Sequence, residues 1–109
     1  PGPLAVADSA AATGGRAVVE TSEVPVGGGV IVRDRAVVVT QPREGRFRVF
    51  SAICTHQGCV VSSISQRRIV CGCHGSRFRI SDGGVVQGPA SRPLAKKSFR
   101  IRRGKIFLT

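Results

Sequence analysis

All four cysteines and both histidines of this 109-residue chain fall in two short runs, and these residues are the best suited to chemistry. The first run reads Cys-Thr-His-Gln-Gly-Cys over residues 54–59, and the second reads Cys-Gly-Cys-His-Gly-Ser over residues 71–76. Each run offers thiolates and one imidazole, which are ligands for zinc and for iron. The same cysteines are also compatible with two disulfides, or with one disulfide beside a metal site.

Zinc is the first metal alternative, because a C-x-C-H stretch can supply part of a Cys₃His or Cys₂His₂ set. Common zinc modules, however, pair C-x₂₋₄-C with H-x₃₋₅-H. Here the first run contains C-x-H and the second contains C-x₂-H, and each leaves one cysteine over. No nucleophile–base arrangement and no glycine-rich phosphate loop is visible in the sequence. The residues alone leave zinc, disulfides and another metal centre open.

Taken together, the two runs resemble the paired motifs of Rieske iron–sulfur proteins, C-T-H-x-G-C and C-x-C-H-G-S. The stretch over residues 88–94 also resembles the proline loop that covers the cluster in that family, and the resemblance extends over residues 17–109. It implies a [2Fe–2S] cluster with two protein ligands on each iron: the thiolates of Cys54 and Cys71 on one, and the imidazoles of His56 and His74 on the other.

The resemblance also implies a disulfide between Cys59 and Cys73 that joins the two runs. Respiratory-type Rieske proteins have this pair, whereas cytoplasmic Rieske ferredoxins and oxygenase domains generally lack it. Closing about 15 residues would stabilise the fold by roughly 3 kcal/mol. Because disulfides persist in oxidising compartments, we expect an extracytoplasmic protein, in a periplasm or tethered at the outer face of the cytoplasmic membrane.

Several further residues match family positions that tune the cluster. Ser76 corresponds to a serine that donates a hydrogen bond to a cluster sulfur, and Gly88 and Pro89 belong to the covering loop. Gln57 stands where quinol-oxidising members often have leucine. Phe78 stands where higher-potential members carry a tyrosine whose hydroxyl reaches a ligand cysteine. Since that donor is missing, we predict a redox potential in the lower or middle part of the Rieske range.

Histidine ligation itself has an electrostatic consequence. The oxidised cluster core carries two positive charges, so two thiolates make the site neutral, and reduction gives it one negative charge. Adding an electron to a neutral site costs less than adding one to an anionic site. Two imidazoles therefore raise the potential, to about −150 to +300 mV across Rieske centres.

Short apolar runs alternate with turn residues along the chain, and helical periodicity is hard to find. Valine and isoleucine supply most of the core, and both favour strands. We expect strands near residues 17–20, 30–32, 37–40, 46–51, 60–63, 68–70, 78–80, 85–86, 98–102 and 105–108. This spacing predicts an all-β antiparallel sandwich or small barrel. The resemblance makes it Rieske-like, with a cluster-binding subdomain formed by two loops.

The first 15 residues differ from the rest in composition. Residues 1–15 are rich in alanine, glycine and proline and contain one charge, Asp8, which predicts a flexible linker. A single Rieske domain over residues 16–109 follows. The sequence contains no run of 18 apolar residues and no visible secretory signal. We therefore expect membrane attachment only through an anchor upstream of this sequence.

The formal net charge of +11 suits an acidic partner as well as it suits a merely solvated surface. Nucleic acid is not expected, because the basic residues are scattered and the phenylalanines match no RNA-binding signature. We predict a one-electron carrier, not an enzyme by itself, that serves a cytochrome and either a quinol-oxidising subunit or a catalytic subunit such as that of arsenite oxidase. The alternatives are a ferredoxin for a Rieske oxygenase and a zinc- or disulfide-stabilised basic binding module.

Overall fold

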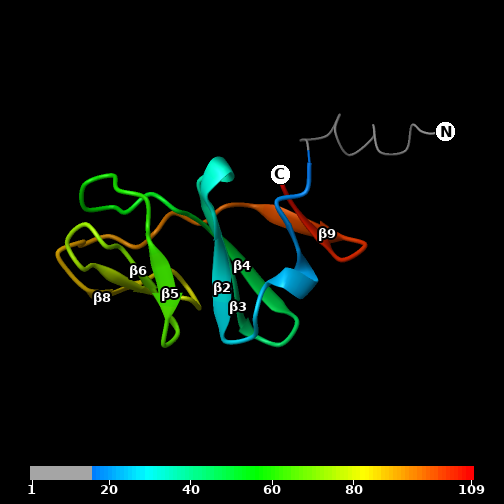
Figure 1. Ribbon diagram of the computed structural model, residues 1–109, viewed down its shortest axis with the longest axis horizontal. Helices are drawn as coiled ribbons and strands as arrows, with labels where there is room; N and C mark the ends of the chain where they lie inside the picture. The colour runs from blue at the N-terminus through cyan, green and yellow to red at the C-terminus, as the bar shows by residue number, and fades with distance from the viewer. Residues whose placement is uncertain (1–15) are drawn as a thin grey trace.

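Three antiparallel sheets make up the protein in the computed structural model, which describes residues 16–109 (Figure 1). The predicted all-β class is confirmed, and the only helices among the described residues are two short 3₁₀ turns. Within this part of the chain no helix is long and apolar enough to cross a membrane. The predicted linker, residues 1–15, lies outside the described residues.

The central sheet has the order β2-β3-β4, formed by Gly28–Val32, Val37–Arg43 and Arg46–Ser51. Successive residues of a strand point to opposite faces of its sheet. Val37 and Val39 of β3 therefore face one hydrophobic core, whereas Val38 faces the other together with Phe50. Both faces of β3 are buried, so this strand joins the two halves of the molecule.

The terminal sheet covers one face of the central sheet. Its order is β1-β10-β9, from Val19–Glu20, Lys105–Leu108 and Phe99–Arg102. Ile106 is fully buried and packs with Val37 and Val39 in the first core. The hairpin of β9 and β10 lies at the opposite end of the molecule from the two cysteine–histidine loops (Figure 1).

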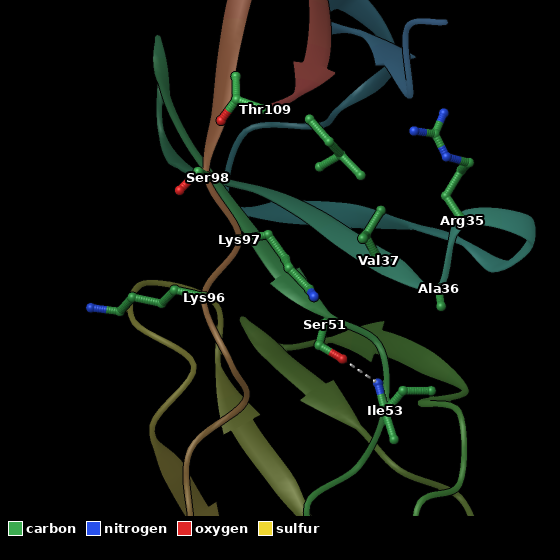
Figure 2. A pocket seen from close by; sticks show the side chains of 10 residues that line it. Arg35, Ala36, Val37, Ser51, Ile53, Lys96, Lys97, Ser98 and Thr109 are labelled. Atoms are coloured by element: carbon green, nitrogen blue, oxygen red, sulfur yellow. Dashed lines mark hydrogen bonds between the residues drawn. The ribbon is translucent and has the colours of Figure 1, made fainter. Parts of the chain in front are cut away.

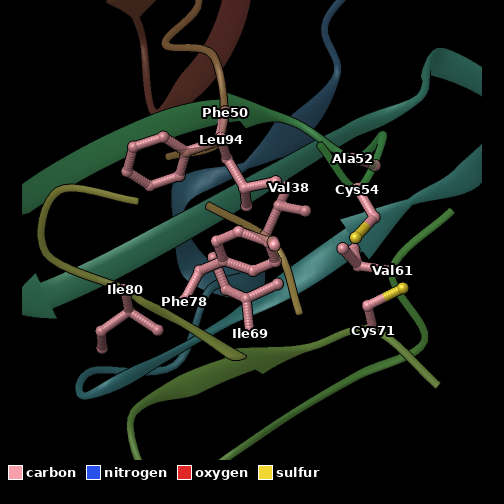
Figure 3. Close-up of a cluster of buried hydrophobic side chains, with 11 residues drawn as sticks. Val38, Phe50, Ala52, Cys54, Val61, Ile69, Cys71, Phe78, Ile80 and Leu94 are labelled. Carbon is pink, nitrogen blue, oxygen red and sulfur yellow. The ribbon is translucent and has the colours of Figure 1, made fainter. Parts of the chain in front are cut away.

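The third sheet packs against the other core. Its order is β5-β6-β7-β8, from Ser63–Ser65, Arg68–Val70, Arg77–Arg79 and Val85–Gln87. Ile69 and Phe78 are fully buried and pack with Phe50 in this second core (Figure 3). Cys54 and Cys71 belong to the same cluster. The two loops are therefore packed directly onto the hydrophobic core.

Several predicted strand boundaries differ from the structure, and two of the differences have a clear physical reason. The strand expected over residues 60–63 is instead Ser63–Ser65, because Val60 forms only an isolated bridge with Ile53. Strand β2 begins at Gly28, two residues before the prediction. A Cβ atom at Gly29 would lie 2.5 Å from the carbonyl oxygen of Val39, so the close approach of β3 requires glycine there.

Candidate metal centre

Loop 1, residues 54–59, is closed by its own backbone. The N–H of Cys54 donates to the carbonyl of Cys59 over 2.7 Å, and the N–H of Gly58 donates to the carbonyl of Cys54 over 3.0 Å. Gly58 has a φ of 78°, a left-handed conformation that favours glycine. These two hydrogen bonds and the left-handed conformation of Gly58 thus define the backbone path between Cys54 and Gly58.

Loop 2, residues 71–76, repeats this frame. The N–H of Cys71 donates to the carbonyl of Ser76 over 2.8 Å, and the N–H of Gly75 donates to the carbonyl of Cys71 over 3.0 Å. Gly75 has a φ of 85°. A Cβ atom at Gly72 would lie 2.9 Å from the hydroxyl of Ser62, so this position has little room for a side chain.

The first cysteine of each loop carries a free, buried thiol. Cys54 is 3% exposed and Cys71 is 1% exposed. Burial raises the pKa of the Cys71 thiol, the backbone of Cys73 lowers it, and the hydrogen bond with Cys54 raises it. The two thiols are therefore adjacent, and without a cation burial favours the protonated form of Cys71. A metal ion would stabilise the thiolate form that binds it.

The two histidines form the exposed part of the same site. His56 comes from loop 1 and His74 from loop 2, and both side chains are exposed. Their ring centroids are 5.1 Å apart and the rings are nearly perpendicular, with an interplanar angle of 89°. The structure thus places two thiols on the core and two imidazoles towards solvent, one of each from each loop.

The other two cysteines form the predicted disulfide. Cys59 and Cys73 are bonded to each other with a Cα–Cα distance of 6.5 Å, across 14 positions of sequence. The bond joins the last residue of loop 1 to the third residue of loop 2. It therefore limits how far the thiol and imidazole of one loop can move from those of the other.

These residues fit a two-iron cluster with mixed ligands. The sulfur atoms of Cys59, Cys71 and Cys73 lie within 4.8 Å of one another, but two of them are bonded to each other and are not available to a metal. The remaining set is two thiols and two imidazoles, which is the donor set of a Rieske [2Fe–2S] centre. Zinc accepts the same four donors. These four side chains are compatible with a [2Fe–2S] cluster or with a zinc ion.

A third segment, residues 88–94, is bound to both loops. The backbone N–H of Ala90 donates to the hydroxyl oxygen of Ser76 over 3.0 Å, and Ser76 is only 1% exposed. The hydroxyl oxygen of Ser76 accepts in this bond, so its proton is not used there. Gly88 and Pro89 are exposed beside this bond.

Three further side chains also hold the loops. The hydroxyl of Thr55 donates to the carbonyl of Arg92 over 2.6 Å, and the guanidinium of Arg92 donates back to the carbonyl of Thr55 over 3.5 Å. The amide of Gln87 donates to the carbonyl of Gly75 over 3.1 Å. Each ligand loop is thus tied to a segment that follows it in the chain.

The other predicted residues lie on opposite sides of the centre. Phe78 is fully buried in the core that contains Cys54 and Cys71, so its ring is on the thiol side. Gln57 is exposed next to His56. The structure therefore brings Phe78 to the interior and Gln57 to the surface.

A groove of about 410 Å³ lies beside Ile53, the residue that precedes loop 1, and is also lined by residues of the C-terminal segment (Figure 2). Neither histidine lines it. Its lining combines basic and apolar side chains and consists of Arg35, Ala36, Val37, Ser51, Ile53, Lys96, Lys97, Ser98, Leu108 and Thr109. The groove therefore does not place a small molecule against the imidazoles.

Known proteins similar to this chain identify the centre. The iron–sulfur subunit of the cytochrome b6-f complex of Chlorobaculum tepidum is 37% identical over 97 residues, which cover 85% of this chain and 52% of that protein. The corresponding subunit of Chlorobaculum thiosulfatiphilum is 32% identical over 94 residues, covering 83% of this chain and 50% of that protein. The chain spans about half the length of these two relatives.

Solved structures show the same fold at lower sequence identity. The plasma membrane Rieske protein PetC3 from Synechocystis PCC 6803 matches with a TM-score of 0.67 and 23% identity, over 86% of this chain and 98% of that one. The Sphingomonas yanoikuyae B1 ferredoxin matches with a TM-score of 0.67 and 21% identity, over 85% and 95%. The family described as the Rieske [2Fe–2S] domain matches residues 16–99. The chain therefore belongs to the Rieske [2Fe–2S] domain family, and its cofactor is the [2Fe–2S] cluster of that family.

Proposed function

We propose that this protein carries single electrons through a [2Fe–2S] cluster held by Cys54, His56, Cys71 and His74. The observation that supports this most is the pairing of two buried, adjacent thiols with two exposed imidazoles, contributed equally by the two loops. A cluster held by these four residues would supply the one-electron redox change. The protein supplies the ligands, excludes water from the thiol side and leaves the imidazole side open.

Each part of the site has a separate role in this proposal. The core around Cys54 and Cys71 keeps the sulfur ligands away from solvent. Ser76 and the N–H groups of loop 2 are the donors that tune the thiolate side. His56 and His74 expose their ring edges, so an electron has a short path from the centre to a partner bound at that surface.

We further propose that the protein works outside the cytoplasm, tethered to the membrane by a segment beyond this sequence. The disulfide between Cys59 and Cys73 supports an oxidising compartment. The relatives named above are iron–sulfur subunits of cytochrome b6-f complexes. By analogy, the donor is a quinol-oxidising or catalytic subunit and the acceptor is a cytochrome. The disulfide disfavours the alternative of a cytoplasmic ferredoxin for an oxygenase.

Absorption and EPR spectra of the purified protein, before and after reduction with dithionite, test the proposed cluster. We expect a red-brown protein with about two irons per chain and an EPR signal that appears only after reduction. Alanine at Cys54 or at Cys71 should remove the colour, whereas alanine at the exposed Ser65 should not. A colourless protein that holds one zinc and takes up no cluster on reconstitution would contradict the proposal.

A further inference from the structure

The terminal sheet β1-β10-β9 covers the first core with only one of its faces. Ile106 of β10 is fully buried in that core, so its neighbours Lys105 and Phe107 point to the other side of the sheet. The register pairs Lys105 with Arg102 and Phe107 with Arg100, and paired residues share a side. We name the side chains on this side the outer sheet face: Arg100, Arg102, Lys105 and Phe107.

The outer sheet face carries a concentrated positive charge. Arg100, Arg102 and Lys105 are exposed on it, and Arg103 is exposed at the tip of the hairpin of β9 and β10. Within residues 16–109, no ion pair involves Arg102, Arg103 or Lys105. Four cations therefore lie within the six consecutive residues 100–105.

One carboxylate lies across from this charge. Glu20 of β1 is the register partner of Lys105. Its side chain accepts the backbone N–H of Glu23, and the side chain of Glu23 accepts the N–H of Glu20, so both carboxylates are used in the turn Thr21–Glu23. Two carboxylates do not balance four cations, and this end of the molecule keeps a net positive charge.

Phe107 is an aromatic side chain among these cations. It is half-buried and belongs to neither hydrophobic core, whereas its neighbours Ile106 and Leu108 pack in the first core. Protein surfaces that lie on membranes combine lysine and arginine, which meet anionic headgroups, with aromatic rings at the boundary of the acyl chains. The outer sheet face has this composition.

The chain also enters the fold at this sheet. The N–H of Val18 donates to the carbonyl of Ile106 over 2.7 Å, and Val19 is the register partner of Ile106. A membrane segment upstream of this sequence would therefore join the fold at the terminal sheet and not at the cysteine–histidine loops. The hairpin of β9 and β10 lies at the opposite end of the molecule from those loops (Figure 1).

We infer that the outer sheet face binds the surface of a bilayer that contains anionic phospholipid. This inference rests on the proposed function, because the proposed tether makes a bilayer the anionic surface close to this sheet. Lipid phosphates pair with Arg102, Arg103 and Lys105, and the ring of Phe107 lies at the level of the headgroups. Since the loops are at the other end, the bound protein leaves both imidazoles uncovered.

Co-sedimentation of the cluster-loaded chain with vesicles measures this binding. The vesicles consist of phosphatidylcholine with about one third phosphatidylglycerol, and pure phosphatidylcholine, which should bind no protein, is the uncharged control. Loss of three charges in the triple variant Arg102→Gln, Arg103→Gln, Lys105→Gln should weaken binding to the anionic vesicles at least about twenty-fold at about 0.1 M salt.

The matched control removes three exposed charges from another hairpin. The triple variant Arg43→Gln, Arg46→Gln, Arg48→Gln changes β3 and β4 and lowers the net charge by the same amount. It should weaken vesicle binding less than about three-fold, because charges more than about 10 Å from the lipid are largely screened at this ionic strength. Equal losses in the two triple variants would overturn the inference, since net charge alone would then account for the binding.

A tryptophan in place of Phe107 reports contact with lipid directly, because the chain has no other tryptophan. The emission of Phe107→Trp should shift to shorter wavelength on anionic vesicles and stay unchanged with phosphatidylcholine alone. Val86→Trp on β8, where the native side chain is 42% exposed, is the control and should show no shift. Shifts of equal size at both positions would contradict the assignment of the outer sheet face.

The remaining outcomes separate this inference from the proposed function. A protein with full iron content and a normal EPR signal that does not bind anionic vesicles contradicts the inference alone. Binding of a single-stranded oligonucleotide through the outer sheet face, with no binding to vesicles, overturns it in favour of nucleic acid. A colourless protein whose vesicle binding depends on the outer sheet face supports the inference and contradicts the proposed electron-carrier function.

Discussion

The two ligand loops share one backbone frame but fill it in different orders. Cys54 and Cys71 occupy the first position, and Gly58 and Gly75 occupy the fifth with positive φ. The third position holds a histidine in loop 1 and a cysteine in loop 2, the fourth holds glutamine and histidine, and the sixth holds cysteine and serine. The shared frame therefore places the first-position thiol of each loop on the core. The loops differ in the position that supplies the imidazole and in the position that supplies the disulfide cysteine, and only loop 2 ends in a serine.

The loops also differ in what holds them from outside. Loop 1 is bound by the reciprocal hydrogen bonds of Thr55 and Arg92. Loop 2 leads directly into β7, and the hairpin of β7 and β8 returns to it through Gln87. Loop 2 is thus one end of a hairpin, whereas loop 1 is held by side-chain hydrogen bonds to the segment of residues 88–94 and by the disulfide to loop 2.

The largest expected effect comes from giving loop 1 the histidine position of loop 2. In the double variant His56→Gln with Gln57→His, the imidazole moves from the third to the fourth position of the same frame. The imidazole would then no longer occupy the place of His56, whose ring lies 5.1 Å from that of His74, and bound iron should fall from about two per chain to near zero. Iron and sulfide analysis after reconstitution measures this. Gln57→His alone keeps His56 and should keep the cluster, and full iron content in the double variant would show that the position within the frame is not decisive.

The next effect concerns the one covalent link between the loops. Replacing Cys59 and Cys73 together by serine should lower the free energy of unfolding by about 3 kcal/mol, because the link closes a loop of about 15 residues in the unfolded chain. Denaturant unfolding of the metal-free protein measures the difference. Reduction of the wild-type disulfide should reproduce it, and an unchanged unfolding midpoint would mean that the frame hydrogen bonds suffice to hold the loops together.

How far the sequence alone predicted this site depends on the separation of the groups involved. The four candidate ligands and the two disulfide cysteines lie in two six-residue motifs, so the sequence alone was enough to recognise their resemblance to a family. The ties of Thr55 to Arg92 and of Gln87 to Gly75 span 37 and 12 residues and use side chains common in any loop. Nothing in the sequence marks such pairs before the chain is folded.

The strands with strong local sequence patterns were also predictable, whereas a strand that depends on its pairing partner was not. The apolar run of β3 and the turn-flanked hairpins have strong local signals, and the structure contains them. The strand near residue 60 was misplaced because Val60 and Val61 look like a strand, whereas they lead out of loop 1. Val61 is fully buried and donates its N–H to the carbonyl of Ala52. The true strand, Ser63–Ser65, is mostly polar and gains its pairing only from β6.

A smaller effect should follow from the residues that tune loop 2. Phe78 lies two positions after Ser76 on β7 and is buried with Cys54 and Cys71. In Phe78→Tyr, a new hydroxyl that donates to a thiolate should stabilise the reduced state by about 1 kcal/mol, which corresponds to roughly 40 mV for one electron. We expect the midpoint potential to rise by that amount in a redox titration. A wild-type value at the top of the Rieske range, or no rise in the variant, would contradict the predicted role of this position.

The smallest effect tests whether loop 2 depends on the far end of its hairpin. Asp82 in the β7–β8 turn accepts hydrogen bonds from Arg79 at 2.9 Å and from the N–H of Gly84 at 2.8 Å, and these contacts lower its pKa. A carboxyl whose pKa falls on folding adds stability that is fully present above its unfolded pKa of about 3.9, and this stability is lost progressively as the pH falls through the lower folded pKa. Because both side chains are about half exposed, Asp82→Asn should cost less than about 1 kcal/mol at pH 7, and the cost should be smaller at pH 3. Thermal unfolding at both values measures this. The rate of cluster loss at pH 7 gives a second measurement, with Asp34→Asn as the matched control. Faster loss in Asp82→Asn alone would show that the β7–β8 turn supports loop 2.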